Sequence, residues 1–301
     1  MSKTYKNLTI IIVTYKTNLR ILEKCLDSIQ SGTNVIIIEN SKKFQNKNYI
    51  IKKYNNIKIK IYYSGKNIGY GRANNLGLLN TKTNFALISN PDVIFSKKFF
   101  RNILKYMDDT LDFSLIGIQY KDNSIWDTAG YFNKKIKVAN FNDYNELNLQ
   151  QVHWIIGCCM LIKLKQFKNK KIFDPNYFLY FEEFDICQKL KKIGHKVFTS
   201  RDLIIKHLGF KSSQLSKDEN SLDYIKIKNW HFMWSFFYYN KKNYGSLKAY
   251  RLSLGKLLRY LVKTFFYLII FNKKNYIKNL YNFSGLFNSM IGKKSFFRIQ
   301  K

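Results

Sequence analysis

The sequence has little proline and little acidic charge. Only two prolines, Pro91 and Pro175, occur in 301 residues, so each is expected at a specific turn and a proline-rich linker is excluded. Aspartate and glutamate total 19, against 52 lysines and arginines. The formal net charge is therefore +33. A field of this sign disfavours cationic partners and favours phosphates, nucleic acid or acidic lipid headgroups.

Part of this positive charge has a less specific explanation. Lysine supplies 45 of the basic residues and arginine only 7, and asparagine, isoleucine, tyrosine and phenylalanine are abundant. Such a composition is typical of an AT-rich genome, whose codons favour these residues. We therefore attribute only part of the charge to an anionic partner.

Cysteine is also scarce. The four cysteines, Cys25, Cys158, Cys159 and Cys187, include no C-x-x-C pair, and two of them are adjacent. This spacing argues against a zinc site or a disulfide framework and fits a reducing compartment. The polar segment Met1–Leu8 lacks the apolar core of a signal peptide, so a cytoplasmic protein is expected.

Apolar residues are plentiful. Hydrophobic residues make up 46% of the chain and aromatic residues 17%, which excludes a disordered composition and provides for a sizeable core. A chain of this length accommodates one large α/β domain and a smaller region.

Runs with strand character alternate with helical patterns in the first part of the chain. Strands are predicted at Leu8–Thr14, Val35–Ile38, Ile57–Ile61, Phe85–Ser89 and Leu115–Ile118, and helices at Leu19–Ile29, Tyr70–Leu79 and Phe99–Met107. This alternation predicts an open, mostly parallel sheet flanked by helices. Ligands of such sheets bind beyond the carboxyl ends of the strands. Polar residues gather at these ends in Thr14-Tyr15, Glu39-Asn40-Ser41 and Asn90-Pro91-Asp92, as a nucleotide site requires.

The last part of the chain differs in composition. Between Tyr224 and Lys301 there are 16 lysines or arginines, no acidic residue, and many aromatic residues. We therefore predict a domain at 1–215 and a basic, mainly helical extension at 216–301. Its most apolar stretch, Leu257–Phe271, has 15 residues and includes two basic ones. This length is too short to span a bilayer comfortably and is typical of a helix lying in the membrane interface.

Two acidic positions are candidates for catalysis. Asp92, after a buried strand, could hold Mg²⁺ or Mn²⁺ against a diphosphate, or it could close an Asx turn. Glu182, Glu183 and Asp185 are expected in the first turn of a helix, where acidic residues commonly complement the helix dipole. They follow an aromatic run that includes Tyr180, and crowding near aromatic rings can raise the pKa of a carboxylate that acts as a general base.

Two further segments carry residues suited to phosphates or metals. His207 could complete a metal site, and Gly209 and Ser212 could approach phosphate oxygens. The segment Asn67–Asn75 superficially matches G-x-G-x-x-G, but Asn74 occupies the third glycine position and the segment follows the third strand. This departure argues against a nicotinamide-dependent oxidoreductase, whereas glycines opening a helix beside Arg72 suit a phosphate or sugar contact.

The order and spacing of these elements resemble glycosyltransferase family 2, which has the GT-A fold, and especially its subgroup of bacterial rhamnosyltransferases. Asn90–Val93 resembles the N-P-D-V form of that family's metal motif, and Phe181–Asp185 resembles F-E-D-x-D. The matching segments in order are Ile11–Lys16, Val35–Ser41, Asn67–Asn75, Asn90–Val93, His153–Gly157, Phe181–Asp185 and His207–Ser212. They cover roughly residues 8–215.

The resemblance implies an inverting glycosyltransferase that uses a nucleotide-sugar donor. It implies that Glu183 is the base, with Asp185 or Glu182 as possible substitutes, and that Asp92 and His207 hold Mg²⁺ or Mn²⁺. Donor contacts are expected from Thr14, Tyr15, Glu39, Asn40, Gly69, Arg72, Asn74, Asp92 and Ser212, and acceptor contacts from Trp154, Gly157 and Tyr180.

Two positions depart from the family pattern. Glu39 and Glu183 stand where aspartate is usual. The longer side chain of Glu39 is expected to alter the preference for the nucleoside. One additional methylene in Glu183 can move a proton acceptor by more than an ångström, a displacement that can matter greatly for catalysis.

The resemblance and the basic extension together suggest partners. We expect a nucleotide-sugar donor and a glycan or lipid-linked acceptor in the synthesis of bacterial surface polysaccharide or lipopolysaccharide. An anionic membrane surface would hold the protein peripherally on the inner face of the cell membrane. The alternative is a nucleic-acid-binding protein with a basic, aromatic surface. It leaves the acidic cluster at Glu182–Asp185 unexplained, so no nucleic acid partner is expected.

Overall fold

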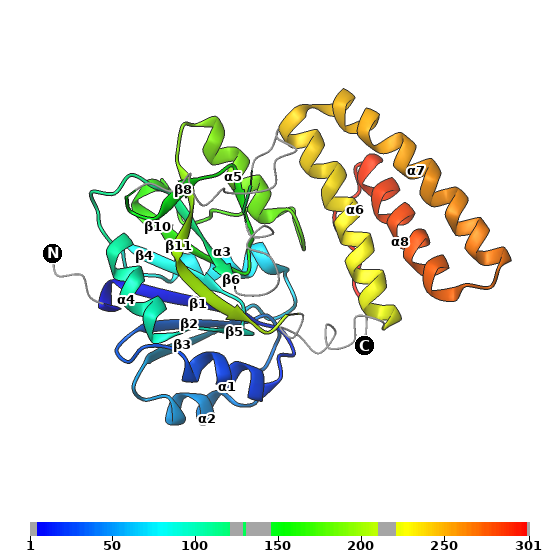
Figure 1. Ribbon diagram of the computed structural model, residues 1–301. Helices are drawn as coiled ribbons and strands as arrows, with labels where there is room; N and C mark the ends of the chain where they lie inside the picture. Colours follow the sequence, from blue (N-terminus) through cyan, green and yellow to red (C-terminus); the bar gives the residue numbers. More distant parts are fainter. Residues whose placement is uncertain (1–4, 121–128, 131–145, 210–220, 300–301) are drawn as a thin grey trace. The chain divides into compact units, whose positions relative to one another are not determined.

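A computed structural model describes residues 5–120, 129–130, 146–209 and 221–299. The chain forms two compact units (Figure 1). The first contains Met1–Phe173 and Ile186–Gln214, and the second contains Asp174–Asp185 and Leu215–Lys301. The predicted division into domains at 1–215 and 216–301 stays a prediction, because compactness alone does not define a domain.

The first unit is built on a nine-stranded sheet with the strand order β3-β2-β1-β4-β10-β6-β11-β5, in which β8 also pairs with β11. A separate two-stranded sheet joins β7 (Ala129–Gly130) and β9 (Trp154–Ile155). The strands of the large sheet are β1 (Leu8–Thr14), β2 (Asn34–Glu39), β3 (Lys58–Tyr63), β4 (Phe85–Ser89), β5 (Val93–Ile94), β6 (Leu115–Tyr120), β8 (Leu149–Gln151), β10 (Cys159–Lys163) and β11 (Val197–His207).

The first four strands of the large sheet are parallel. Strand β1 pairs with β2 on one side and with β4 on the other. The register aligns Thr14 with Glu39, and Ile12 with Ser89. The direction of strand progression therefore reverses at β1, so its carboxyl end is a topological switch point where α/β sheets bind ligands.

The remaining strands make the sheet mixed. Strand β10 is antiparallel to both β4 and β6, and β11 is parallel to β6 but antiparallel to β5 and β8. The predicted α/β class is confirmed. The antiparallel insertion of β10 is a tertiary feature that hydrophobic periodicity does not reveal.

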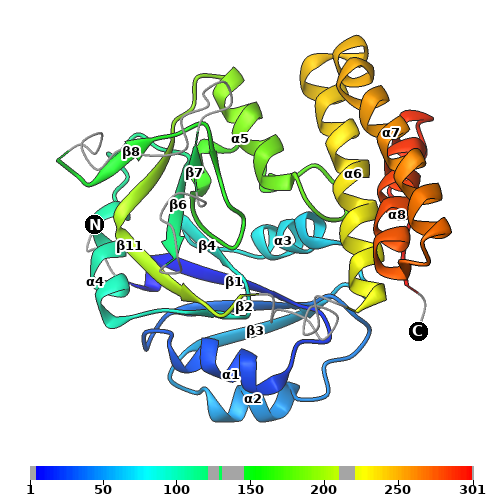
Figure 2. The same ribbon diagram turned by 45° about the vertical axis from the view of Figure 1, so that its right-hand side comes forward.

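Helices cover both faces of the sheet because side chains alternate along each strand. Ile10 and Ile12 pack in one core with residues of α1, α2 and α4, whereas Ile11 packs in a second core with α3 and with the later residues of α5. Figure 2 shows α1 and α2 on one side of the sheet and α3 on the other. These helices are α1 (Leu19–Asp27), α2 (Lys47–Lys53), α3 (Tyr70–Leu79), α4 (Lys97–Tyr106) and α5 (Glu182–Lys192), with short 3-10 turns at Tyr5–Asn7 and Leu164–Gln166.

The second unit contains three helices that lie side by side: α6 (Leu222–Tyr244), α7 (Ser246–Ile269) and α8 (Lys273–Met290) (Figures 1 and 2). The helical character predicted for the extension is confirmed. Gly285 allows α6 and α8 to approach closely, since a Cβ at this position would collide with the backbone of Trp230. Among the described residues, no helix combines the length and the apolar character needed to cross a membrane.

Candidate active site

The residues expected in the active site fall into two groups, one in each unit. The first unit holds the residues expected to bind the donor, together with Trp154 and Gly157. The second unit holds Tyr180 and the three acidic residues of the cluster. Each group is described by itself, and Ser212 lies outside the described residues.

Glu39 lies at the carboxyl end of β2 and organises two neighbouring hydroxyls. Thr14 at the end of β1 donates a hydrogen bond of 2.7 Å to Oε2 of Glu39, and Ser41 donates one of 2.6 Å to Oε1. Burial raises the pKa of Glu39, and these two hydrogen bonds partly oppose that effect. The carboxyl is therefore held in a fixed orientation at the switch point.

Asn40 fixes the loop that leads into α3. Its Oδ1 accepts hydrogen bonds from Ser64 Oγ and Ile68 N, each at 3.0 Å, and its Nδ2 donates to Asn67 Oδ1 at 3.0 Å. All these partners lie in the loop between β3 and α3, so Asn40 holds the conformation of that loop. A direct contact between Asn40 and a donor stays a prediction.

The N-terminus of α3 opens with Gly69, whose φ of 92° lies in a region that favours glycine. Asn74 is buried in this helix, and its Nδ2 donates to Tyr70 O at 3.1 Å. Arg72 is exposed on the same helix. Tyr70 donates from its hydroxyl to Gly157 O at 2.5 Å, which ties the start of α3 to the turn before β10. An anion near this helix terminus would be favoured by the helix dipole.

Asp92 follows β4 in a tight turn, in which Val93 N donates to Asn90 O at 3.3 Å. The turn is joined to the segment before β10 by a 2.8 Å bond from Asn90 N to Cys158 O. Strand β5 then pairs with the end of β11, aligning Val93 with His207. As a result, His207 Nε2 lies 3.3 Å from Oδ1 of Asp92. Asp92 and His207 are far apart in the sequence and were expected to share a metal ion, and they are neighbours in the first unit.

This pair fits a divalent cation that also binds phosphate oxygens. The Asp92 side chain is 1% exposed, and carboxylate oxygen with imidazole nitrogen is a donor set used for Mn²⁺ and, less often, Mg²⁺. Nε2 of His207 is buried and makes no hydrogen bond with any residue in the described part of the chain. The same part of the chain contains no group of three or more His, Cys, Asp or Glu side chains placed to bind a metal. A cation here would need further ligands from the donor and from water.

Two residues expected to bind substrates are partly exposed in the first unit. Tyr15 follows β1, and its backbone N–H donates to Thr17 Oγ1 at 3.2 Å. Trp154 lies in β9 opposite Gly130 of β7. A Cβ at Gly130 would lie 2.6 Å from the indole ring, so the glycine is needed for the present position of Trp154.

The acidic cluster lies in the first turn of α5, as predicted. The two residues before it, Tyr180 and Phe181, both have φ of 71°. This conformation is unfavourable for bulky side chains and persists only where the surroundings enforce it. Phe181 packs against Phe232 and Tyr239 of α6, with ring centroids 5.3 and 5.4 Å apart, respectively. Backbone strain of this kind clusters at functional sites.

The two glutamates of the cluster differ in environment. Glu182 is 2% exposed, and burial together with the charge of Glu183 raises its pKa well above the usual range. Glu183 is partly exposed, and burial raises its pKa to about 7. Burial therefore favours the uncharged form of Glu182 more strongly than that of Glu183, and Glu183 is the accessible carboxyl that can accept a proton.

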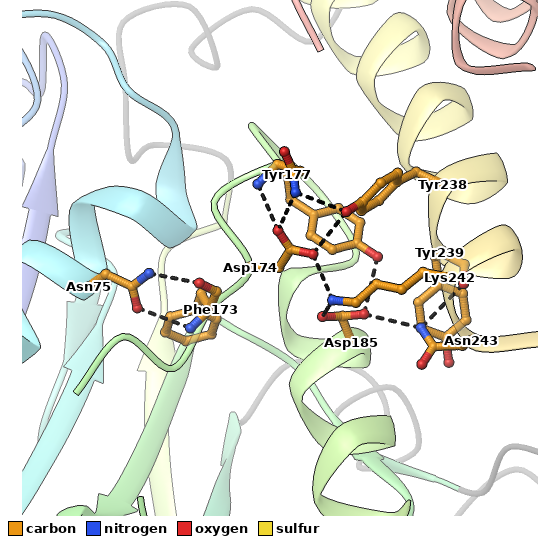
Figure 3. Close-up of polar contacts among 10 residues, drawn as sticks. Asn75, Phe173, Asp174, Tyr177, Asp185, Tyr238, Tyr239, Lys242 and Asn243 are labelled. Atoms are coloured by element: carbon orange, nitrogen blue, oxygen red, sulfur yellow. Dashed lines mark hydrogen bonds and ion pairs between the residues drawn. The ribbon is translucent and has the colours of Figure 1, made fainter. Parts of the chain in front are cut away.

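Asp185, the third member, takes part in a network of hydrogen bonds with α6 (Figure 3). Its Oδ2 lies 2.6 Å from Nζ of Lys242, and its Oδ1 accepts from Asn243 Nδ2 at 3.1 Å and from Tyr177 OH at 3.3 Å. Both carboxylate oxygens are thus engaged. The geometry favours Glu183 over Asp185 as the base, although this assignment stays a prediction.

Several supporting residues were not predicted from the sequence. Tyr70 and Ser41 lie within the recognised motifs but were given no role. Lys242 and Asn243 lie in the basic extension, where a lysine in so basic a segment carries no distinguishing signal. The one signal available was a helical spacing. The residues of α6 that contact the segment Asp174–Asp185 recur with that spacing: Phe232, Ser235, Phe236, Tyr239, Lys242 and Asn243.

Comparison with known proteins gives a family match over this region. The profile of glycosyl transferase family 2 matches residues 9–183. The low-salt glycan biosynthesis hexosyltransferase Agl10 of Haloferax volcanii is 24% identical over 200 residues, which are 62% of this chain and 62% of that protein. The rhamnosyltransferase WbbL of Escherichia coli is 23% identical over 205 residues, 60% of this chain and 74% of that protein. The match therefore spans less than two thirds of the archaeal relative.

A solved structure supports the fold. The mannosyltransferase PcManGT of Pyrobaculum calidifontis, determined in complex with GDP-Man and Mn²⁺, superimposes with a TM-score of 0.54 at 11% sequence identity. The superposition covers 96% of this chain and 88% of that one. Strand order and family match agree on the GT-A fold expected from the sequence.

Proposed function

Because the chain belongs to glycosyl transferase family 2, we propose that it is an inverting glycosyltransferase. It transfers a sugar from a nucleoside-diphosphate donor to a hydroxyl group of a glycan or lipid-linked acceptor. One observation carries the proposal: buried Asp92 lies at the sheet switch point with the imidazole of His207 3.3 Å away. This is where an α/β sheet binds a nucleotide and where a diphosphate would share a cation.

The first unit would bind the donor. Glu39, orienting Thr14 and Ser41 at the ends of β1 and β2, offers polar atoms to the nucleoside. The loop held by Asn40 brings the N-terminus of α3, with exposed Arg72, into position for phosphate or sugar contacts. Asp92 and His207 would hold Mg²⁺ or Mn²⁺, which, when bound, supplies positive charge to the departing diphosphate. The mannosyltransferase of Pyrobaculum calidifontis was determined in complex with GDP-Man and Mn²⁺, which supports a divalent cation beside a sugar nucleotide in this fold.

The second unit would supply the base. In an inverting transfer the acceptor oxygen bonds to the anomeric carbon as the bond from that carbon to the diphosphate breaks. Glu183 accepts the proton of the attacking hydroxyl, for which its pKa of about 7 is well matched at neutral pH. Tyr180 and, in the first unit, Trp154 would offer flat faces to sugar rings.

A thermal-shift screen tests the donor class. Full-length protein would be heated with UDP-, dTDP- and GDP-sugars, each with MnCl₂, MgCl₂ or EDTA. We expect one nucleotide class to raise the melting temperature only when a divalent cation is present, because ligands that bind the native state stabilise it. If no sugar nucleotide changes the melting temperature under any condition, the donor assignment is wrong.

We further propose that the acceptor is lipid-linked and that helix α7 contacts an anionic membrane. The exposed fractions are 50% for Leu254, 61% for Leu258, 66% for Val262, 59% for Phe265 and 73% for Ile269. Their spacing places them on one face of the helix. No acidic residue occurs between Tyr224 and Lys301, and α7 itself carries five basic residues, so the helix that bears this apolar stripe has a net positive charge. Anionic lipid is therefore the complementary partner.

Liposome flotation tests this contact. Replacing Leu258, Val262 and Phe265 together by serine keeps the charge of α7 but removes the centre of the apolar stripe. We expect the variant to float poorly with phosphatidylglycerol-containing vesicles that retain the wild type. The matched control is serine at Leu79, which is exposed on α3. Equal flotation of the triple variant and the wild type would remove α7 from the proposal.

A further inference from the structure

The segment Asp174–Asp185 carries both glutamates of the cluster and is attached to α6 along its whole length. Ser235 donates to Leu179 O at 3.0 Å. Tyr238 donates from its hydroxyl to Asp174 Oδ2, also at 3.0 Å. All these residues belong to the second unit. The segment therefore packs with helix α6 of the C-terminal extension.

Lys242 joins the two ends of this segment. Its Nζ lies 2.6 Å from Oδ2 of Asp174 and 2.6 Å from Oδ2 of Asp185 (Figure 3). One ammonium group thus closes a loop of twelve residues at its first and last positions. Closing a loop by a fixed contact reduces the conformations open to the chain between the joined points.

The two aspartates are well shielded, which makes this pair of contacts different from an ordinary surface ion pair. The Asp174 side chain is 12% exposed and that of Asp185 is 5% exposed. Burial lowers the pKa of Lys242, but the hydrogen bonds to both aspartates outweigh it and raise the pKa overall. Hydrogen bonds between charged groups are shorter and stronger than neutral ones.

The segment needs such support because its middle is strained. Tyr180 and Phe181 both hold positive φ values immediately before Glu182, a conformation that is unfavourable for bulky side chains. Aromatic packing on α6 opposes relaxation at Phe181. The Lys242 contacts oppose relaxation at the two ends. Without them, the first turn of α5 can shift and carry Glu183 with it.

We propose that Lys242 is a positioning residue for Glu183, so that helix α6 of the C-terminal extension is part of the catalytic apparatus. This inference rests on the proposed function in one respect, the role of Glu183 as base. It predicts that the extension is needed for the chemical step as well as for any contact with a membrane. A displacement of about 1 Å in a catalytic group can cost 10²-fold in rate.

The test compares three full-length variants. Lys242→Met removes the ammonium group and keeps an apolar side chain of similar length. Lys242→Arg keeps the positive charge and provides N–H donors for both aspartates. Lys241→Met is the matched control, because Lys241 is the exposed neighbouring lysine on α6. For each protein we would measure transfer of labelled sugar to a detergent-solubilised lipid extract, the KM for the donor, and amide hydrogen exchange in peptides covering 176–185.

The expected result is a loss of about tenfold or more in kcat for Lys242→Met with the donor KM changed less than twofold, as for displacement of a catalytic group. Faster exchange in 176–185 should accompany the loss, Lys242→Arg should recover most of the rate, and Lys241→Met should behave as wild type. Wild-type kcat in Lys242→Met, or a loss of rate with unchanged exchange, would overturn the proposal.

Failure of the proposed function gives a different result. A wild-type protein that transfers no sugar from any nucleotide donor contradicts the glycosyltransferase assignment, whatever the exchange data show. In that case hydrogen exchange alone decides whether Lys242 orders the segment. Unchanged exchange in Lys242→Met would then refute the structural part of the inference as well.

Discussion

At the scale of single residues, the assignment of the base rests on two adjacent glutamates that differ in burial and in the shift of their pKa. Glu182 is buried and its pKa is raised well above the usual range, whereas Glu183 is partly exposed with a pKa of about 7. Adjacent carboxyl groups whose environments separate their pKa values are a common basis for dividing acid–base roles. Here the accessible member is the one suited to take a proton.

Substitution by glutamine separates the two roles. Glu183→Gln should lower kcat by about 10²–10⁴-fold, the usual contribution of a general base. Glu182→Gln should cost far less, because glutamine resembles the protonated acid in shape and charge. Steady-state transfer assays on both variants would measure this contrast. Equal losses, or a larger loss for Glu182→Gln, would contradict the assignment of the base.

The pH dependence of transfer follows from the same residue. Below pH 7, Glu183 becomes protonated and cannot take the proton from the hydroxyl group of the acceptor. We therefore expect kcat to fall about tenfold for each pH unit below 7 and to be constant above pH 7. A kcat profile from pH 5 to 8 measures this, and the acid limb should be absent from the residual activity of Glu183→Gln. An unchanged limb in that variant would assign the titration to another group.

The raised pKa of Glu183 also makes the free energy of unfolding depend on pH. The native pKa of Glu183 exceeds the ordinary glutamate value of about 4.3, so the folded protein binds this proton more tightly than the unfolded chain does. Protonated Glu183 therefore adds to the free energy of unfolding. This contribution is fully present below pH ~4.3 and is lost as the pH rises through about 7.

At the scale of secondary-structure elements, the crossing of α6 and α8 depends on a single glycine. Gly285→Ala should force the two helices apart, because its Cβ would collide with the backbone of Trp230, at a cost of about 1–3 kcal/mol in the free energy of unfolding. Urea denaturation followed by circular dichroism measures this. Gly255→Ala in α7 is the control, since a Cβ there meets no atom within 4 Å.

The control should be neutral or stabilising by about 0.5–1 kcal/mol, because alanine favours a helix interior over glycine. Unfolding curves that coincide for Gly285→Ala and wild type would show that the helices do not need this close approach.

The elements best predicted from the sequence are those with a strong local pattern. The residues of β1, β4 and α3 were predicted with the observed bounds, because continuous apolar runs and glycine-bounded helical spacing are local signals. The antiparallel strand β10 was not predicted. Its direction depends on pairing between Met160 and Ile88, which are distant in the chain, and nothing in a short window encodes that partner.

The candidate site shows the same division between local and distant information. The acidic cluster at the start of α5 was predicted because three carboxylates within four positions are a local signal. The proximity of Asp92 to His207 depends on the pairing of β5 with β11, and only the family resemblance anticipated it. The contacts of Asp185 with Lys242 could not be predicted, because one lysine among many in the extension has no distinguishing sequence feature.

At the scale of the whole molecule, the chain combines a GT-A sheet domain with a basic, helical C-terminal unit. The sheet places Asp92 at the switch point, and the helical unit holds the segment that carries Glu183. In the proposed mechanism, the C-terminal unit therefore positions the base, Glu183. Its apolar, cationic helix α7 provides the proposed contact with an anionic membrane.

The central claim is that the chain moves a sugar from a nucleoside diphosphate with the help of Asp92. The most direct measurement is release of nucleoside diphosphate from each sugar nucleotide, in the presence of lipid extract and MnCl₂, by wild type and by Asp92→Ala. The account predicts release with one nucleotide class, its loss on addition of EDTA, and a rate at least about 10²-fold lower in the variant, as for loss of several kcal/mol of charge stabilisation. Release at the same rate in Asp92→Ala, or no release from any sugar nucleotide by the wild type, would contradict it.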